Sequence, residues 1–308
     1  MISICIPIHN YYAYPLVRRL RNQIDKLNVS DEVEIVCIDD HSSGYHLKQN
    51  MGIVDVANYL RLEQNVGRSR IRNLFLKYTK GDWLLFLDDD SLVPDNFIKK
   101  YREKLDDKYG VIVGGRVYDK GCDDRIHRLR YLYGTKVESL PADRRSQHPY
   151  RSFMSNNFLV RRDVFEKIKF DQRITKYGHE DTLFGYRLEQ NNIPILHVNN
   201  PVTNGDVETN PEFLHKTIEA VENLAYIYEF MWEDQKFCSS VRLLNTYAKV
   251  RRMNLQNLVY FFFKMLKGPL ESHFVSGSGV SIAQFNFYKL GIFIRKIHHP
   301  ETKRTADY

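Results

Sequence analysis

The sequence predicts an α/β fold, with an open, mixed but mainly parallel sheet flanked by helices and a helical C-terminal extension. Short apolar runs rich in β-branched residues alternate with helical patterns from the first residue onward. These runs are continuously apolar, which is typical of strands covered on both faces, as in a parallel sheet. From about residue 237 the chain becomes basic, aromatic and helical in pattern.

Four runs predict strands in the first half of the chain: "ISICIPI" (2–8), "VEIVCID" (33–39), "DWLLFLDDD" (82–90) and "GVIVGGRVY" (110–118). A helix is expected before the third strand. Its apolar residues follow the i, i+3, i+4, i+7 spacing of one helix face, and they are Ile71, Leu74, Phe75 and Tyr78. Gly81 is a plausible stop for this helix.

The second half continues the alternation. "SFMSNNFLVRRDVFEKI" (152–168) predicts a strand followed by a helix. "YGHEDTLFGYRLEQNNIPILHV" (177–198) predicts a loop, a helix that starts near Glu180, and a strand. Another helix begins after Pro211, and "SGSGVS" (276–281) breaks the helical C-terminal region.

Composition favours a globular protein in a reducing compartment. The 308 residues are 43% hydrophobic and 27% charged, which is enough apolar material for a large core. The four cysteines are widely spaced and form no C-x-x-C pair, so we expect free thiols. The N-terminus has no signal-peptide pattern, and the longest strongly apolar stretch (258–266) is shorter than the ~20 residues of a membrane span. We therefore expect a cytoplasmic location.

Acidic residues follow two of the predicted strands. Ligands of open α/β sheets bind at the carboxyl ends of strands, which here are residues 8–10, 39–43 and 88–91. Clustered carboxylates such as Asp88, Asp89 and Asp90 suit Mg²⁺ or Mn²⁺. Two other interpretations compete: an acidic turn that caps the next helix, and the nucleophile loop of a haloacid-dehalogenase-type phosphatase. The second is disfavoured because two strands precede the motif, whereas that family usually places it on the first strand.

The motifs occur in an order that resembles the family 2 glycosyltransferases, which have a GT-A fold. The nucleotide-binding half is represented by "SICIPIHNY", "VCIDDHSS", "NVGRSRIRN" and "GDWLLFLDDDSLVPDNF", and the acceptor half by the segment from "SFMSNNFLV" to "YGHEDTLFGYRL". The resemblance covers roughly residues 1–230. It implies a GT-A catalytic domain at residues 1–236, with halves 1–118 and 119–236, followed by a basic helical region at 237–308.

The resemblance also implies roles for individual residues. Backbone at Pro7, Ile8, His9 and Asn10, together with Asp40, would hold the nucleobase, and the Asp40 carboxylate can accept the imide N–H of uracil. Arg72 would lie near the diphosphate. Asp88 and Asp89 would bind the nucleotide sugar, and Asp90, with Asp88, would bind the divalent metal that bridges the phosphates. The implied cofactor is Mn²⁺ or Mg²⁺.

Family 2 enzymes invert the anomeric carbon in one displacement, so they need one general base for the acceptor hydroxyl. Asp181 matches that base, with Glu180 as the second candidate. Asn157 and His179 fall on the acceptor side of the resemblance. Both carboxylates would also favour a helix N-terminus through the helix dipole, which is the purely structural interpretation.

One position departs from the family pattern. Many relatives have a histidine in an "NPVxH" segment that can join the metal, but this chain has "NNPVTNG", with Asn204 in that place. His197 lies seven residues earlier and is expected to be a core or strand-end histidine. The lost ligand implies a weaker metal site, completed by water or by the Asn204 amide oxygen.

These observations predict an inverting glycosyltransferase that moves a hexosyl or N-acetylhexosaminyl group from a nucleotide sugar, UDP being favoured, to a saccharide or lipid-linked saccharide, as in surface polysaccharide synthesis. The alternative is a catalytically silent sugar-nucleotide-binding or scaffold protein. Nucleic acid is not an expected partner, because the body has no basic, aromatic-lined groove motif.

The C-terminal region carries the net positive charge. Residues 242–308 contain 11 Lys and Arg against 3 Asp and Glu, a net charge of +8, whereas residues 1–241 carry 34 against 35. Cations interleaved with aromatic runs can place a helix in the headgroup layer of an anionic membrane. They can equally form the solvated rim of aromatics that pack on the body, and helical spacing alone does not separate the two.

Overall fold

Residues 1–298 are described by the computed structural model, and they form two compact units. Unit 1 comprises residues 1–119, 134–175 and 180–206; unit 2 comprises residues 120–133 and 176–179 and the chain from Val207 onward. The division falls elsewhere than the expected domain boundary after residue 236, because the helix that precedes residue 236 packs with the C-terminal helices. The boundary of the catalytic domain stays a prediction, and residues 299–308 of the expected C-terminal region lie outside the described residues.

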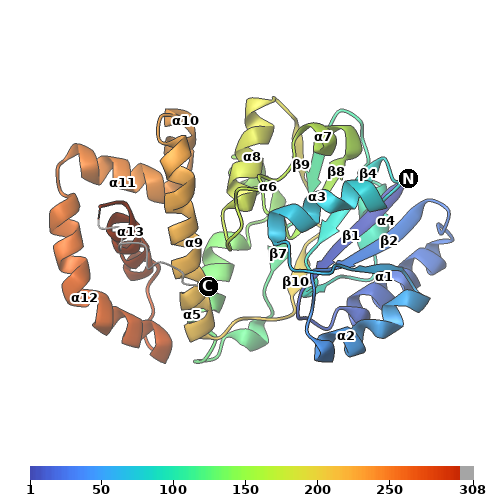
Figure 1. Ribbon diagram of the computed structural model, residues 1–308, viewed down its shortest axis with the longest axis horizontal. Coiled ribbons are helices and arrows are strands. Elements are labelled where there is room, and N and C mark those ends of the chain that lie inside the picture. The colour runs from blue at the N-terminus through green and yellow to red at the C-terminus, as the bar shows by residue number, and fades with distance from the viewer. Residues whose placement is uncertain (299–308) are drawn as a thin grey trace. The chain divides into compact units, whose positions relative to one another are not determined.

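Unit 1 is built on a seven-stranded sheet (Figure 1). In spatial order its strands are β3 (Asn58–Arg61), β2 (Val33–Asp39), β1 (Ile2–Ile8), β4 (Trp83–Leu87), β8 (Asn157–Arg161), β6 (Val111–Val113) and β9 (Ile195–His197). Strand β8 runs antiparallel to β4 and β6, and the other neighbouring pairs are parallel. The predicted fold class, a mixed and mainly parallel sheet with flanking helices, is confirmed. A second sheet joins β5 (Ser91–Leu92), β10 (Val202–Asn204) and β7 (Arg116–Val117).

Both units contain helices. Those of unit 1 are α1 (Tyr14–Leu27), α2 (Gly44–Asn50), η1 (Met51–Asp55), α3 (Arg68–Tyr78), α4 (Phe97–Arg102), η3 (Gly134–Glu138), α6 (Ala142–Ser146), α7 (Arg162–Lys167) and α8 (Glu180–Gln190). Those of unit 2 are η2 (Lys120–Cys122), α5 (Arg128–Tyr133), α9 (Asn210–Met231), α10 (Gln235–Ser240), α11 (Arg242–Arg252), α12 (Gln256–Ser276) and α13 (Ile282–His298).

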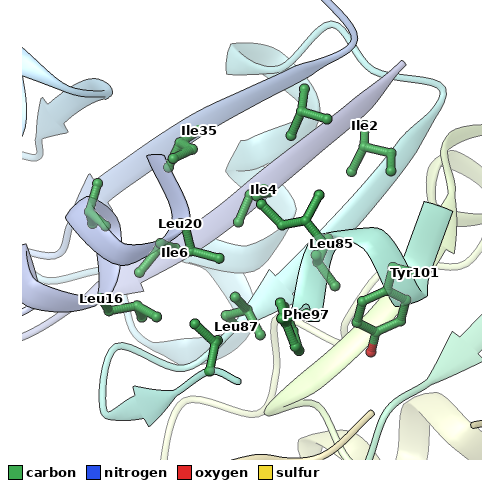
Figure 2. Packing of buried hydrophobic residues seen from close by; sticks show 14 of the residues in the cluster. Ile2, Ile4, Ile6, Leu16, Leu20, Ile35, Leu85, Leu87, Phe97 and Tyr101 are labelled. Carbon is green, nitrogen blue, oxygen red and sulfur yellow. The ribbon is translucent and has the colours of Figure 1, made fainter. Parts of the chain in front are cut away.

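The two faces of the large sheet are both buried, as the continuous apolar runs predicted. Alternate residues of β1, from Ile2 to Ile8, pack with α1 and α4 in one cluster, which Figure 2 shows around Leu20 and Phe97. The opposite face, which includes Cys5, packs with α3, α7 and α8. A strand with apolar neighbours on both faces gains burial from every residue, so its sequence does not alternate.

Two local features differ from the sequence expectation. The run at 110–118 splits into β6 and β7 because the chain turns at Gly115, which has a φ of +93°. Only glycine fits there, since a Cβ at this position would lie 2.8 Å from the Arg145 guanidinium. Helix α3 ends at Tyr78, before Gly81. Gly81 instead allows close contact with β1, since its N–H donates to Ser3 Oγ (2.8 Å).

Unit 2 is an assembly of helices in which α13 packs against α9 and α12 (Figure 1). Helix α9 begins with a capping box, in which Thr209 and Glu212 satisfy each other's backbone N–H groups. The inner face of α12 contributes Phe263 and Phe274, whose rings contact Tyr288 of α13. The break at residues 276–281 is confirmed, because it separates α12 from α13.

The close approach at Gly81 yields a stability prediction. A Cβ at this position would lie 2.6 Å from Ser3 Oγ and 2.7 Å from the Ser3 backbone nitrogen, which cannot move without shifting β1. We expect Gly81→Ala to lower the free energy of unfolding by about 1–3 kcal/mol. The control is Gly44→Ala in α2, where nothing lies within 4 Å of the new Cβ and no loss is expected. Equal stability of the two variants in urea unfolding would contradict the packing argument.

Candidate functional site

The loops that follow β1 and β2 are tied together at one edge of the sheet. Asn10, with φ of +52°, donates its N–H to Ser42 Oγ (2.9 Å), and its side-chain oxygen accepts the N–H of Ser43 (2.7 Å). The Ile8 carbonyl accepts the N–H of Asp40 (2.7 Å). Because β1 and β2 are parallel neighbours, their carboxyl ends meet here, as the sequence predicted.

Asp40 organises a third segment at this edge. Its two carboxylate oxygens accept the backbone N–H groups of Val66 (2.7 Å) and Gly67 (3.0 Å), just before α3 begins. The side chain is almost completely buried. Asp40 therefore fixes the loop that leads to α3, and each oxygen keeps acceptor capacity for a further donor. Its contact with a nucleobase stays a prediction.

The carboxylates after β4 lie at the same edge and are linked to the β1 loop. The His9 N–H donates to Asp89 Oδ2 (3.1 Å). Burial, followed by the negative charge of Asp90, raises the pKa of Asp89 to about 8, although the His9 N–H acts in the opposite direction. Neighbouring carboxyl groups are thus held close together at this edge.

Arg72 connects these carboxylates to the N-terminus of α8. Its guanidinium is 2% exposed and donates to Asp88 Oδ1 (3.0 Å). The same group lies 3.6 Å from Glu180 Oε1 and over the ring of Phe170. Arg72 is therefore a buried ion-pair residue and not a solvated cation on the helix surface.

Asp181 and Glu180 open α8 in different environments. Glu180 is buried between Arg72 and Arg68, whose guanidinium lies 3.8 Å from Oε1. Asp181 Oδ1 accepts the N–H of Thr182 (2.7 Å). Burial, followed by the charge of Glu180, raises the pKa of Asp181 well above its usual range. A raised pKa makes the Asp181 carboxylate a stronger proton acceptor than an ordinary aspartate.

The second sheet brings residues 204–206 to the aspartates. Asn204 is opposite Ser91 in the β10–β5 ladder, and the Gly205 N–H donates to the Asp90 carbonyl (2.8 Å). The Asn204 amide oxygen accepts the N–H of Asp206 (3.1 Å), so it shapes this turn. Arg116 lies 3.7 Å from Asp90 Oδ2.

Sequence reasoning missed several residues at this edge. Arg116 and Asp206 belong to no motif in the sequence. Burial, followed by the negative charges of Asp206 and Asp90, raises the pKa of Tyr11 to about 12.

Asn156 is a buried residue at the same edge, and its carbonyl accepts the Asp88 N–H (3.1 Å). Neither atom of its side-chain amide has a hydrogen-bond partner among the described residues. Only the pairing of β4 with β8 brings Asn156 to Asp88, and the sequence does not specify that pairing.

The two residues placed on the acceptor side have other contacts. Asn157 has no exposed surface, and its amide donates to the carbonyls of Gly115 and Asn200 while accepting from the Tyr101 hydroxyl (2.7 Å). His179 belongs to unit 2, where burial, followed by the charge of Lys289, lowers its pKa to about 4. Acceptor-side roles for Asn157 and His179 stay predictions. The hydrogen bonds of Asn157 give this residue a structural role in the sheet.

His197 is a strand-end residue in the core, as expected from the sequence. Its ring lies 2.8 Å from a guanidinium nitrogen of the buried Arg145 and 2.9 Å from the Pro149 carbonyl. Burial is the main cause that lowers its pKa to about 4. A neutral ring can accept from Arg145 with one nitrogen and donate to Pro149 with the other.

The aspartates fit a hard divalent cation by chemistry. Carboxylate oxygens are the ligands that Mg²⁺ and Mn²⁺ prefer, and Mg²⁺ sites on phosphate substrates use one or two carboxylates plus substrate phosphates. Among residues 1–298, no group of three or more His, Cys, Asp or Glu side chains could hold a metal by itself. Asp88 and Asp90, together with a diphosphate, form a donor set of the appropriate type.

Comparisons with known proteins give the same family as the motifs. The family model described as glycosyl transferase family 2 matches residues 3–169, which is more than half of the chain. One uncharacterized glycosyltransferase of Haemophilus influenzae is 22% identical over 269 residues, covering 85% of this chain and 93% of that protein. A second protein from the same organism, also an uncharacterized glycosyltransferase, is 34% identical over 107 residues, covering 34% and 33%. In three of the curated relatives, this chain spans only 33% to 60% of their length.

A solved structure shares the fold. The mannosyltransferase PcManGT of Pyrobaculum calidifontis, in complex with GDP-Man and Mn²⁺, superimposes with a TM-score of 0.57 at 12% identity, covering 98% of this chain and 88% of that protein. The fold is of the GT-A type.

The position of Arg72 yields a stability prediction. Arg72→Gln removes the only cation that contacts both Asp88 and Glu180 among the described residues, and it leaves Glu180 buried beside Arg68 alone. Removing one partner of a buried ion pair costs about 3–5 kcal/mol of unfolding free energy. The control is Arg70→Gln on the exposed face of α3, for which a change within ~0.5 kcal/mol is expected. Indistinguishable urea unfolding curves for the two variants would exclude this role for Arg72.

Proposed function

Because this chain belongs to glycosyltransferase family 2, we propose that it is an inverting, metal-dependent enzyme that transfers a sugar from a nucleotide diphosphate sugar to a saccharide or lipid-linked saccharide. The observation that carries this proposal is the Arg72 guanidinium, which joins Asp88, after β4, to Glu180, at the start of α8. This contact links Asp88, which would bind the donor, to the start of α8, where Asp181 would accept the proton.

The donor is proposed to bind across the carboxyl ends of β1, β2 and β4. Backbone at residues 7–10 and the Asp40 carboxylate would hold the base, and Asp89 would face the ribose. A carboxylate at Asp40 favours a base with an N–H between two carbonyls, as in uracil, because it can accept that hydrogen. The GDP-Man complex of the Pyrobaculum enzyme makes GDP sugars the second group of donors to test.

Asp90 and Asp88 would hold Mn²⁺ or Mg²⁺ together with the diphosphate. When bound, such a cation neutralises the negative charge of the departing nucleoside diphosphate as a Lewis acid. The raised pKa of Asp89 supports this proposal, since it reflects the burial of this carboxyl beside the negative charge of Asp90. Arg72 would orient Asp88.

On the acceptor side, Asp181 is proposed as the general base. As the bond between the acceptor oxygen and the anomeric carbon forms, the bond from that carbon to the phosphate oxygen breaks, and the hydroxyl proton moves to Asp181. Glu180 is the weaker candidate, because its carboxylate already lies beside the two guanidinium groups of Arg68 and Arg72. The unpartnered amide of buried Asn156 is an additional candidate for binding a hydroxyl of the transferred sugar.

We place the reaction in surface polysaccharide synthesis on the cytoplasmic side of a membrane, with a hexosyl or N-acetylhexosaminyl group as the transferred sugar. The support is the family and the charge of the C-terminal region. No helix among residues 1–298 is both long and apolar enough to cross a membrane. An acceptor attached to lipid would therefore be reached from the membrane surface by the described part of the chain.

The metal assignment predicts the behaviour of Asp90→Ala. Without this carboxylate, we expect Mn²⁺-dependent binding of UDP to be lost, because the diphosphate would lack its bridging cation. Titration calorimetry with UDP, with and without Mn²⁺, measures the effect. The matched control is Asp82→Ala at the opposite end of β4, which is exposed and should leave affinity unchanged. Equal UDP affinity of Asp90→Ala and the unchanged protein would refute the assignment.

The base assignment predicts a different result for Asp181→Asn. Donor affinity should persist while kcat falls ~10²–10⁴-fold, because the lost group acts only during the reaction. Glu180→Gln should reduce kcat less. Since the base must be ionised and its pKa is raised, kcat should fall as pH decreases through a value above the ordinary aspartate pKa of about 4. Loss of kcat in Glu180→Gln with normal turnover in Asp181→Asn would transfer the role to Glu180.

A further inference from the structure

Helix α12 has a second apolar face that no part of the described chain covers. Its inner face packs on α13 through Phe263 and Phe274. Five large apolar side chains on the other face are 44% to 61% exposed: Leu258, Phe261, Phe262, Met265 and Leu266. Their spacing of three and four residues places them along one side of the helix. We call these five residues the outer stripe of α12.

A helix on the surface of a protein normally turns charged and polar residues to the solvent. Exposed apolar side chains that occur singly need no explanation, but a contiguous set on one helix face marks an interaction site. Helix α12 does not satisfy the requirements for a membrane span. The outer stripe is therefore suited to contact with a surface rather than to insertion across a bilayer.

The charge around the stripe identifies the partner. From Arg242 to Leu270 the chain has six Lys and Arg residues and no Asp or Glu. Arg251 and Arg252 are exposed at the end of α11, immediately before α12, and Lys264 is exposed beside the stripe. None of these three forms an ion pair within residues 1–298, although Lys264 lies over the ring of Tyr260. Cations that form no ion pair among the described residues thus precede the stripe or lie within it.

We propose that the outer stripe of α12 and these cations dock the protein on an anionic lipid surface. The phenylalanine, leucine and methionine side chains enter the boundary between headgroups and acyl chains, and the cations contact lipid phosphates, as in interfacial amphipathic helices. Each cation close to such a surface strengthens binding roughly fivefold. This proposal does not depend on the proposed reaction.

A second copy of the chain fits the surface less well. Self-association through the stripe would leave Arg251 and Arg252 without an anionic partner, and it would place Lys264 of one copy near Lys264 of the other, because Lys264 lies within the stripe. Like charges at an interface oppose association. An anionic surface instead satisfies both the apolar and the basic parts of the patch.

The test is co-sedimentation of the full chain with vesicles, without nucleotide. The expected result is binding to phosphatidylcholine vesicles that contain phosphatidylglycerol, no binding to phosphatidylcholine alone, and release at high salt. Phe261→Ser/Phe262→Ser should weaken binding at least tenfold, and so should Arg251→Gln/Arg252→Gln. Matched controls on unit 1 are the exposed apolar pair Met51→Ser/Val54→Ser and the exposed basic pair Arg18→Gln/Arg19→Gln, which should bind like the unchanged protein.

Circular dichroism verifies that each variant is folded, and the arginine variant tests the proposal independently of the phenylalanine variant. The proposal is overturned if the unchanged protein stays in the supernatant at low salt, if it binds phosphatidylcholine alone equally well, or if both variants sediment as it does. It is also overturned if sedimentation velocity without lipid shows a dimer that Phe261→Ser/Phe262→Ser dissociates, because the stripe would then join two copies.

Discussion

The candidate site depends on the ion pairs that the buried guanidinium of Arg72 forms with Asp88 and Glu180. Carboxylates gathered at one edge of a sheet repel one another, and burial increases the cost of their ionisation. Arg72 pairs with Asp88 and Glu180 at once, and Arg68 lies close to Glu180. Burial, followed by the charge of a neighbouring carboxylate, raises the pKa values of Asp89 and Asp181. One buried cation thus links the carboxylates after β4 to those at the start of α8.

The sheet creates this concentration of charge through its topology. Strands β2, β1 and β4 are parallel neighbours, so the segments that follow them meet at one edge. The antiparallel β8 then delivers Asn156 to Asp88, and the small sheet delivers residues 204–206 to Asp90. Strands β1, β2 and β4 are almost completely buried, so packing fixes the points at which the polar segments leave the sheet, and the contacts of the polar side chains then fix those segments.

Much of this arrangement could be predicted from the sequence. Continuous apolar runs located β1, β2 and β4, and the acidic residues after them indicated the edge where a ligand would bind. The run at 110–118 was predicted as one strand because the turn at Gly115 depends on contact with Arg145, which is distant in sequence. The contributions of Asn156, Arg116 and Asp206 arise from strand pairing between distant segments, and no local pattern marks them. The resemblance favoured Asp181 over Glu180 as the base, and the sequence alone could not show that Arg68 and Arg72 lie beside Glu180.

The central claim is that the edge formed by β1, β2 and β4 binds a nucleoside diphosphate together with a divalent cation. Thermal unfolding of the full chain with UDP, GDP, ADP and CMP, each with and without Mn²⁺, tests this claim most directly. A ligand at 100 times its Kd stabilises the folded state by about 2.7 kcal/mol. We predict a rise in Tm with UDP or GDP that requires Mn²⁺, and little change with CMP. The claim is contradicted if no nucleoside diphosphate raises the Tm in the presence of Mn²⁺ or Mg²⁺.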